Sequence, residues 1–228
     1  MLRHIFSNEI GILGAVLYIA SALVVIFLTM PVHEYAHGLV AYKLGDNTPK
    51  WQGRLTLNPF AHIDYLGALS ILLFGFGWAK PVRVNMNNFK NPKIGMAITA
   101  LAGPVSNLIV AFISLLLFNL SDVVFLYFDN QILKAIFINV LYYIALINIS
   151  LAVFNLIPIP PLDGSRILSV VLPNRIYYTI MRYERFIYFG LLALLWIGIL
   201  DIPLSILTNI TFSGLNNLAY LPFKLLGY

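Results

Sequence analysis

Long runs of apolar residues constrain the fold of this chain more than any other feature of its sequence. About 20 consecutive apolar residues cross a bilayer as a helix. Runs of that kind cover about residues 10–30, 94–118 and 132–157, and the first continues through Pro31 to Tyr42. A fourth covers about residues 186–200 and extends towards 207. The sequence therefore predicts an all-α polytopic membrane protein, with a core of three transmembrane helices and an additional C-terminal span.

Composition supports this class and excludes others. Hydrophobic residues make up 60% of the chain and charged residues 10%, whereas soluble chains carry about 25% charged residues. Without cysteine, the chain has no disulfide, iron–sulfur cluster or thiolate metal site, so only His, Asp and Glu remain as strong metal ligands. The fourteen Lys and Arg are scattered between the apolar runs, which argues against a nucleic-acid partner and for contact with a lipid bilayer.

Two shorter apolar segments complete the predicted organisation. Residues 66–79 are too few for a span and are interrupted by glycine, which favours a re-entrant or surface piece. Residues 210–226 contain asparagine, proline and lysine and are interpreted as an interfacial helix. No repeat or long linker divides the chain, so we expect one membrane-embedded domain over 1–228, with its core at about 10–170 and a C-terminal span and tail at 186–228.

The basic residues predict the orientation of the spans, because cytoplasmic loops carry an excess of Lys and Arg. Connections rich in these residues occupy 43–65, 80–93 and 158–185, whereas 120–133 contains Asp122 and Asp129 with almost no basic residue. The first three segments are therefore expected in the cytoplasm and the last outside. This arrangement requires that residues 66–79 do not cross the membrane.

Two segments in these connections have the pattern of short strands. WQGRLTL (51–57) alternates in polarity, and WAKPVRVN (78–85) is rich in β-forming residues. They predict a small membrane-associated β element, with irregular loop as the alternative.

The sequence His33-Glu34-Tyr35-Ala36-His37 carries the strongest chemical signal. Two histidines four positions apart on a helix share one face and can reach one metal ion, while the adjacent glutamate can act on a water molecule. Ionised side chains in an apolar segment are costly and are functional by default. The alternative is a pair of hydrogen-bonded core histidines, with Glu34 paired to a lysine.

A catalytic zinc site needs a third protein ligand, and Asp163 is the best placed of the candidates. It lies at the cytoplasmic end of the third span, where three prolines break the helix, and the predicted topology puts the histidines at the same depth. Asp163 could instead cap the following helix. The other candidate ligands are His62, Asp64 and Glu184.

Several motifs together resemble those of the site-2 proteases, which are zinc intramembrane metalloproteases. The resemblance rests on HEYAHG (33–38), AGPVSN (102–107) and NLIPIPPLDG (155–164), and RLTLNPFAHID (54–64) and FGWAKPVRVN (76–85) are also similar. It covers about residues 30–170 and looks closest to the short bacterial and archaeal branch. We see no room for the PDZ domain that many members of the family carry.

The resemblance implies one zinc ion per chain, bound by His33, His37 and Asp163, with Glu34 as the catalytic acid and base. It also implies that the substrates are membrane-spanning helices of other proteins, cut within or near the bilayer, here of a prokaryotic cell. The basic connections predict that the active site lies towards the cytoplasm. Asn107 would line this site and donate to the substrate backbone or the oxyanion, although a hydrogen bond between helices would also explain it.

Two other functions fit parts of this pattern. Broken helices with intramembrane Asp, His and Glu also occur in transporters and ion pathways. A catalytically silent membrane scaffold of the same fold is the second alternative, and the intact Glu34 and three candidate ligands disfavour it. Zinc binding, together with peptidase activity that is lost when Glu34 is replaced, would distinguish the enzyme from both.

Overall fold

The computed structural model of the protein describes residues 12–74, 79–125 and 130–225. Helices dominate this part of the chain, and it contains no strand. The elements are, in chain order, α2 (Ile12–Val24), the π-helix η1 (Val25–Thr29), α3 (Met30–Lys43), α4 (Thr48–Trp51), α5 (Pro59–His62), α6 (Tyr65–Phe74), the 3-10 turn η2 (Met86–Asn88), α7 (Pro92–Val124), α8 (Gln131–Asn155), α9 (Asp163–Val171), α10 (Asn174–Arg182), α11 (Glu184–Ile197) and α12 (Asp201–Leu225).

The three predicted core spans are confirmed. The first is the continuous helical segment Gly14–Lys43, which runs through α2, η1 and α3. The second is Pro92–Ser121 within α7, and the third is Gln131–Asn155, the whole of α8. Each is long and apolar enough to cross a membrane.

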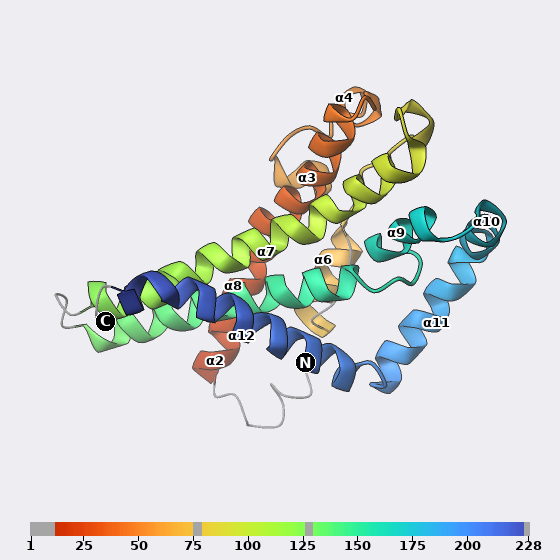
Figure 1. The fold of residues 1–228 in the computed structure, drawn as a ribbon. Coiled ribbons are helices and arrows are strands. Elements are labelled where there is room, and N and C mark those ends of the chain that lie inside the picture. The colour runs from red at the N-terminus through yellow and green to blue at the C-terminus, as the bar shows by residue number, and fades with distance from the viewer. Residues whose placement is uncertain (1–11, 75–78, 126–129, 226–228) are drawn as a thin grey trace.

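Asparagine caps define where the two longest central helices begin. The side chain of Asn91 accepts a hydrogen bond from the N–H of Ile94 before α7, and Asn130 does the same for Leu133 before α8. The two helices then lie side by side along their length (Figure 1). Ala111, Ala145 and Ala219, from α7, α8 and α12, are fully buried and allow these three backbones to approach closely.

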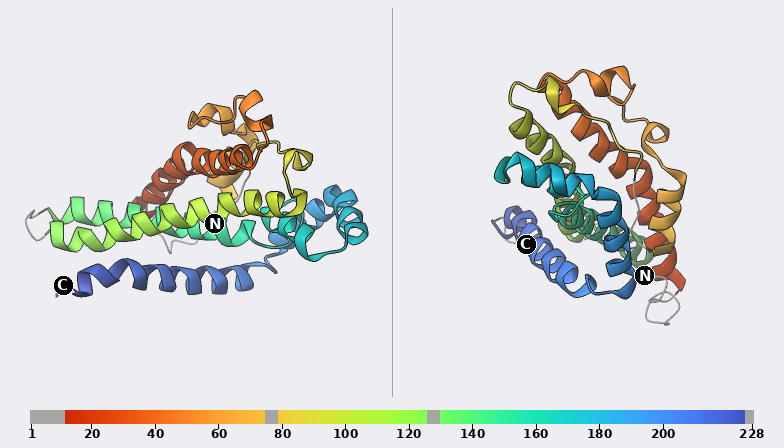
Figure 2. Two further views of the ribbon diagram at one scale, coloured as in Figure 1. Left: turned by 45° about the horizontal axis from the view of Figure 1, so that its top comes forward. Right: turned by 90° about the vertical axis from the view of Figure 1, so that its right-hand side faces the viewer.

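The C-terminal part differs from the prediction. The apolar run at 186–207 does not form one straight helix, because α11 ends at Gly198, whose φ of 81° only glycine adopts without strain. The chain then turns by 85° into α12, whose first residue is the favourable anion Asp201. Residues 210–225 are therefore part of α12, which lies along α7 and α8 and is not a separate interfacial helix (Figures 1 and 2).

The predicted β element is wrong within the described residues. Trp51 ends the short helix α4, and residues 52–57 form turns and bends. Residues 79–85 are extended but pair with no other strand, and residue 78 lies outside the described part. An extended segment becomes a strand only where a partner backbone satisfies it. Here a single N–H, that of Lys80, donates to another backbone of the described residues, at the carbonyl of His62. Side chains bind two further N–H groups, since Val82 donates to Glu34 and Asn85 donates to Asp46.

The predicted short segment at 66–79 is helical only over α6, whose ten residues are too few to cross a bilayer. Residues 75–78 lie outside the described part.

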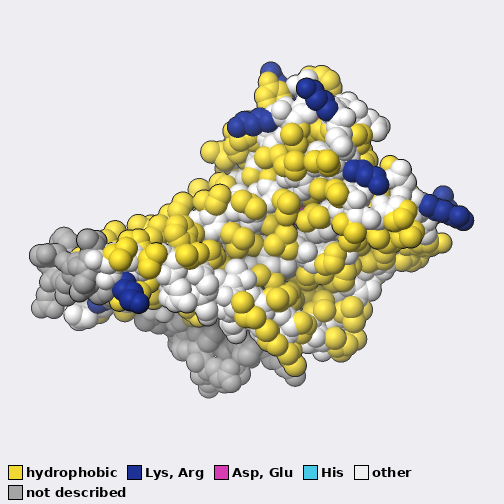
Figure 3. Space-filling view, in the orientation of Figure 1, with side chains coloured by type: hydrophobic (Ala, Val, Ile, Leu, Met, Phe, Trp, Pro, Cys, Tyr) yellow, Lys and Arg dark blue, Asp and Glu magenta, His cyan; other side chains and the backbone are white. Residues whose placement is uncertain are grey.

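The connections predicted to be cytoplasmic gather at one end of the α7–α8 pair. The connections around α4 and η2 and the helices α9 and α10 lie there, whereas the end of α7 and the start of α8 lie at the opposite end (Figure 1). On the face drawn in Figure 3, apolar side chains cover most of the surface and basic side chains lie at its periphery. The membrane side that each end faces stays a prediction from the basic residues.

Candidate metal centre

The helix α3 brings the two predicted histidine ligands into position. His33 and His37 are one turn apart and are 9% and 7% exposed. Their Nε2 atoms lie 3.1 Å apart. The π-helix η1 immediately precedes this turn, and π-helical turns often occur at functional sites.

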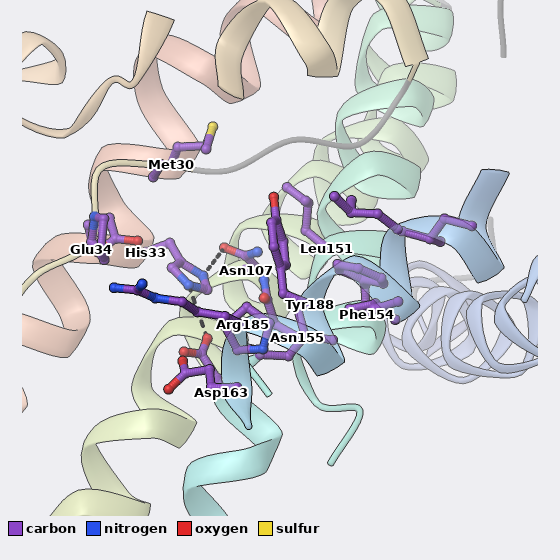
Figure 4. A pocket seen from close by; sticks show the side chains of 18 of the residues that line it. Met30, His33, Glu34, Asn107, Leu151, Phe154, Asn155, Asp163, Arg185 and Tyr188 are labelled. Carbon is purple, nitrogen blue, oxygen red and sulfur yellow. Dashed lines mark hydrogen bonds and ion pairs between the residues drawn. The ribbon is translucent and has the colours of Figure 1, made fainter. Parts of the chain in front are cut away.

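The third donor, Asp163, comes from the start of α9. Its Oδ2 atom lies 3.3 Å from Nε2 of His33 (Figure 4) and 3.2 Å from Nε2 of His37. No backbone N–H of the described residues bonds to its carboxylate, so the predicted alternative of a helix cap is wrong. Among the residues that the structure describes, these three form the one group of His, Asp and Glu that could hold a metal ion.

The geometry of this group fits zinc. A tetrahedral zinc ion bonded to its ligands at about 2.0–2.1 Å separates two donor atoms by about 3.3–3.4 Å. The three observed separations of 3.1, 3.2 and 3.3 Å lie close to that value. Oδ2 of Asp163 is moreover buried without a hydrogen-bond partner, as expected for an atom whose lone pair binds a metal.

Hydrogen bonds at the far side of each imidazole orient the donors. Nδ1 of His33 donates to Oδ1 of Asn107 at 3.3 Å, and Nδ1 of His37 donates to the carbonyl of Thr99 at 2.7 Å. With the protons on Nδ1, both Nε2 atoms present lone pairs towards Asp163. Three lone-pair donors then converge without a proton between them, an arrangement that a cation stabilises.

The charge state of Asp163 suits metal binding. Burial raises the pKa of its carboxyl group, but His37 and His33, when their rings are protonated, lower this pKa by a larger amount, so that it lies below the ordinary value for aspartate. The carboxyl group is therefore ionised at neutral pH, as a metal ligand must be.

Two glycines permit the close approach of the elements that build the site. A Cβ atom on Gly103 of α7 would lie 2.3 Å from Nε2 of His37 and 2.5 Å from Nε2 of His33. A Cβ atom on Gly164 would lie 2.2 Å from the carbonyl oxygen of Leu156. Sequence reasoning did not assign these roles, although both glycines stand in the quoted motifs AGPVSN and NLIPIPPLDG.

Glu34 lies beside the histidines and is 8% exposed. Its Oε2 atom accepts a 2.9 Å hydrogen bond from the N–H of Val82. The predicted alternative of a lysine partner is therefore wrong. The extended segment at 79–85, although no strand, supplies one wall of the site.

A cleft of about 680 Å³ opens beside these residues (Figure 4). Glu34, His33, Asp163 and Asn107 line one side, and Tyr188 with other residues of α11 lines the opposite side. The cleft can admit both water and an extended peptide to the candidate metal site.

The structure separates the predicted third-ligand candidates. His62 is fully buried, but its Nε2 atom bonds to the carbonyl of Thr56 at 2.8 Å. Asp64 accepts from the N–H of Gly67, and Glu184 pairs with Arg166 at 3.1 Å. None of them belongs to the His33–His37–Asp163 group.

Comparison with known proteins agrees with this site. Peptidase family M50 matches residues 21–198, which include all three donor residues and Glu34. The chain belongs to peptidase family M50. It is therefore a zinc metalloprotease, a hydrolase of peptide bonds, and the predicted resemblance to the site-2 proteases is confirmed.

Curated relatives of this M50 peptidase carry names of the same kind. YwhC of Bacillus subtilis (strain 168), a candidate zinc metalloprotease, is 42% identical over 153 residues, which are 66% of this chain and 68% of the relative. Rip2 of Mycolicibacterium smegmatis, another candidate zinc metalloprotease, is 29% identical over 142 residues, or 60% of this chain and 51% of the relative. The zinc metalloprotease MJ0392 of Methanocaldococcus jannaschii is 27% identical over 169 residues, which are 74% of this chain and 39% of the relative.

The chain thus spans about half or less of the length of the last two relatives. No solved structure matches it significantly.

Proposed function

We propose that this M50 peptidase cleaves other membrane proteins within or next to their membrane-spanning segments. The observation that carries the proposal is the origin of the site residues. His33, His37 and Asn107 belong to apolar helices long enough to cross a bilayer, and Asp163 follows the end of a third such helix. A substrate must therefore reach the site among membrane-spanning helices.

His33, His37 and Asp163 are proposed to hold one zinc ion per chain. When bound there, zinc would act as a Lewis acid on the scissile carbonyl and lower the pKa of a water molecule. The hydrogen bonds from His33 to Asn107 and from His37 to Thr99 keep both rings oriented for this task.

Glu34 is proposed to take a proton from the attacking water and deliver it to the leaving amine. The N–H of Val82 holds its Oε2 atom in place, which leaves Oε1 to meet the water. Asn107, whose amide also lines the cleft, is proposed to donate from Nδ2 to the substrate backbone or the oxyanion while its Oδ1 atom holds His33.

The basic connections at 43–65, 80–93 and 158–185 support a site that faces the cytoplasm. The protein is proposed to reside in the membrane of a prokaryotic cell, consistent with the organisms of its relatives. Its proposed partners are transmembrane substrate proteins and the lipid bilayer. A nucleic-acid partner is not proposed.

Cleavage of a labelled transmembrane peptide in detergent micelles by the purified protein tests the proposal. Glu34→Gln should lower the rate about a hundredfold or more and retain zinc, and a chelator should abolish cleavage reversibly. Cleavage of water-soluble peptides but of no transmembrane peptide would contradict the intramembrane substrate. Equal turnover by Glu34→Gln would contradict the mechanism, and ion conduction in place of hydrolysis would favour the transporter alternative.

A further inference from the structure

The cleft beside the candidate metal centre is lined by two arginines that have no acidic partner within the described residues. Each acidic residue lining it is already engaged. Glu34 accepts from Val82, Asp163 contacts both histidines, and Glu184 pairs with Arg166. The two arginines are Arg182 and Arg185, and neither forms an ion pair within the described part of the chain.

Helix electrostatics explain Arg182 but not Arg185. Arg182 is in the last turn of α10, where the helix dipole favours a cation. Arg185 is in the first turn of α11, where the dipole favours an anion, and Glu184 already occupies that turn. Arg185 is therefore not placed there to stabilise its own helix, and a side chain that breaks a local rule points to a function.

The side chain of Arg185 is directed into the cleft. Its guanidinium end extends towards the side on which Glu34, His33 and Asp163 lie (Figure 4). Arg185 is also an exposed residue, so its guanidinium is open both to water and to a ligand that enters the cleft. The ion pair between Glu184 and Arg166 joins the start of α11 to α9, the helix that begins with Asp163. Arg185 is thus held close to the ligand end of the cleft.

An exposed guanidinium group favours a carboxylate ligand. Apolar side chains such as Leu151, Phe154 and Leu191 line other parts of the cleft, and a substrate packed against them would cover Arg185 and weaken the screening of its charge by water. The planar guanidinium group matches a carboxylate in a bidentate pair.

We infer that Arg185 is a specificity-determining residue, which binds the carboxylate of an Asp or Glu side chain close to the scissile bond of the substrate. The inference rests on the proposed function and adds a substrate class to it. The favoured substrate segments carry an acidic residue next to the cleaved bond, and segments with a lysine there are disfavoured by charge repulsion.

Charge-swapped substrates test this inference. A transmembrane peptide with an amidated C-terminus is cut by the wild-type protein in a zwitterionic detergent, and its cleavage site is mapped. Glu, Gln or Lys is then placed at each position within three residues of that site. At one or more positions, the wild-type kcat/KM should be about tenfold higher for Glu than for Gln, and lowest for Lys.

Substitutions of the arginine provide the second arm. Arg185→Gln should reduce the ratio of kcat/KM for the Glu and Gln peptides to about one. Arg185→Glu should reverse the order so that the Lys peptide is preferred, a rescue that a merely structural role cannot produce. The matched control, Arg175→Gln, changes an exposed arginine of α10 that does not line the cleft and should keep the wild-type preference. Binding of the same peptides to the zinc-loaded Glu34→Gln protein, measured by fluorescence anisotropy, should show the same order without cleavage.

Two results would overturn the inference. One is a wild-type protein that does not discriminate between Glu and Gln at any position, in either cleavage or binding. The other is an equal loss of kcat for all three peptides in Arg185→Gln. That result would show that the guanidinium acts on the scissile peptide group and not on a side chain of the substrate. Failure of the proposed function is distinct, because the wild-type protein would then cleave none of the peptides. Binding of peptides that carry Glu, Gln or Lys at successive positions along the transmembrane segment would then still test Arg185.

Discussion

The backbone N–H of Val82 donates a 2.9 Å hydrogen bond to Oε2 of Glu34, although 48 positions separate the two residues in the chain. One carboxylate oxygen is thereby held by the segment at 79–85, and the other remains for chemistry. A backbone donor is well suited to this task, because most side-chain substitutions leave it in place.

Val82→Pro should therefore lower kcat about tenfold, because it removes this donor and lets the carboxylate turn away from its productive position. Val82→Ala keeps the N–H and should remain close to wild type. Val84→Pro is the matched proline control, since the N–H of Val84 makes no hydrogen bond within the described residues. Equal rates for Val82→Pro and Val84→Pro would show that the bond does not position Glu34.

Gly103→Ala should disrupt the metal site, because the added Cβ atom would lie 2.3 Å from Nε2 of His37. We expect zinc content, measured by mass spectrometry of the purified protein, to fall strongly. Gly214→Ala in α12 is the control, as a Cβ there meets no atom within 4 Å and alanine favours a helix by up to about 1 kcal/mol. A Gly103→Ala protein with full zinc and full activity would contradict the close packing of α7 on α3.

Asp163→Ala should lower the affinity for zinc by more than about a hundredfold, since it removes a direct ligand, whereas loss of an outer partner already costs about 10- to 100-fold. His33→Ala and His37→Ala should behave alike, and Asp201→Ala, an exposed acidic residue in α12, should bind zinc as wild type does. Titration with a competing chelator provides the measurement. Unchanged affinity in Asp163→Ala would assign the third ligand elsewhere.

Asp46 should stabilise the connections next to the site. It is fully buried and accepts hydrogen bonds from the N–H and hydroxyl of Thr48, the N–H of Asn85 and the side chain of Asn88. Asp46→Ala leaves these donors unpaired and should cost about 1–3 kcal/mol of stability. Hydrogen exchange of residues 44–50 and 85–89 should report the loss, and unchanged protection there would contradict it.

The contribution of Asp46 should depend on pH. Burial raises the pKa of its carboxyl group, but the hydrogen bonds from Thr48, Asn85 and Asn88 lower this pKa by a larger amount. The folded-state pKa therefore lies below the ordinary value. A lowered pKa means that the stabilisation is present above the unfolded-state pKa of about 3.9 and is lost as the pH falls through the folded-state pKa. The difference in protection between wild type and Asp46→Ala should therefore shrink only in strong acid.

Single cysteines can report the orientation, because the chain has none of its own. Asn87→Cys and Gln131→Cys are both exposed positions, at opposite ends of the α7–α8 pair. A membrane-impermeant thiol reagent added to intact cells should label position 131 and leave position 87 unlabelled until the cells are opened. The reverse pattern would place the cleft on the outer side.

Local physical rules were sufficient for much of this protein. Hydropathy over about 20 residues is a property of the chain itself, so α7, α8 and the first span could be predicted close to their observed bounds. The helical period alone places His33 and His37 on one face. Asp163 was predicted by a longer argument, which required that the C-terminal ends of the first and third spans face the same side of the membrane and that prolines break the helix there.

The tertiary structure decided what depends on distant partners. Residues 79–85 have the composition of a strand, yet within the described chain only Lys80 bonds to another backbone, the carbonyl of His62, and side chains of Glu34 and Asp46 bind the N–H groups further along. The sequence alone gives no special role to Gly103. Its role follows from the packing of α7 against the histidines of α3, which leaves no space for a Cβ atom. Asn107 was expected to contact the substrate or another helix, and the fold shows that its Oδ1 atom meets His33, 74 positions away. Such contacts arise from the docking of helices, and no local pattern encodes which side chains docking will bring together.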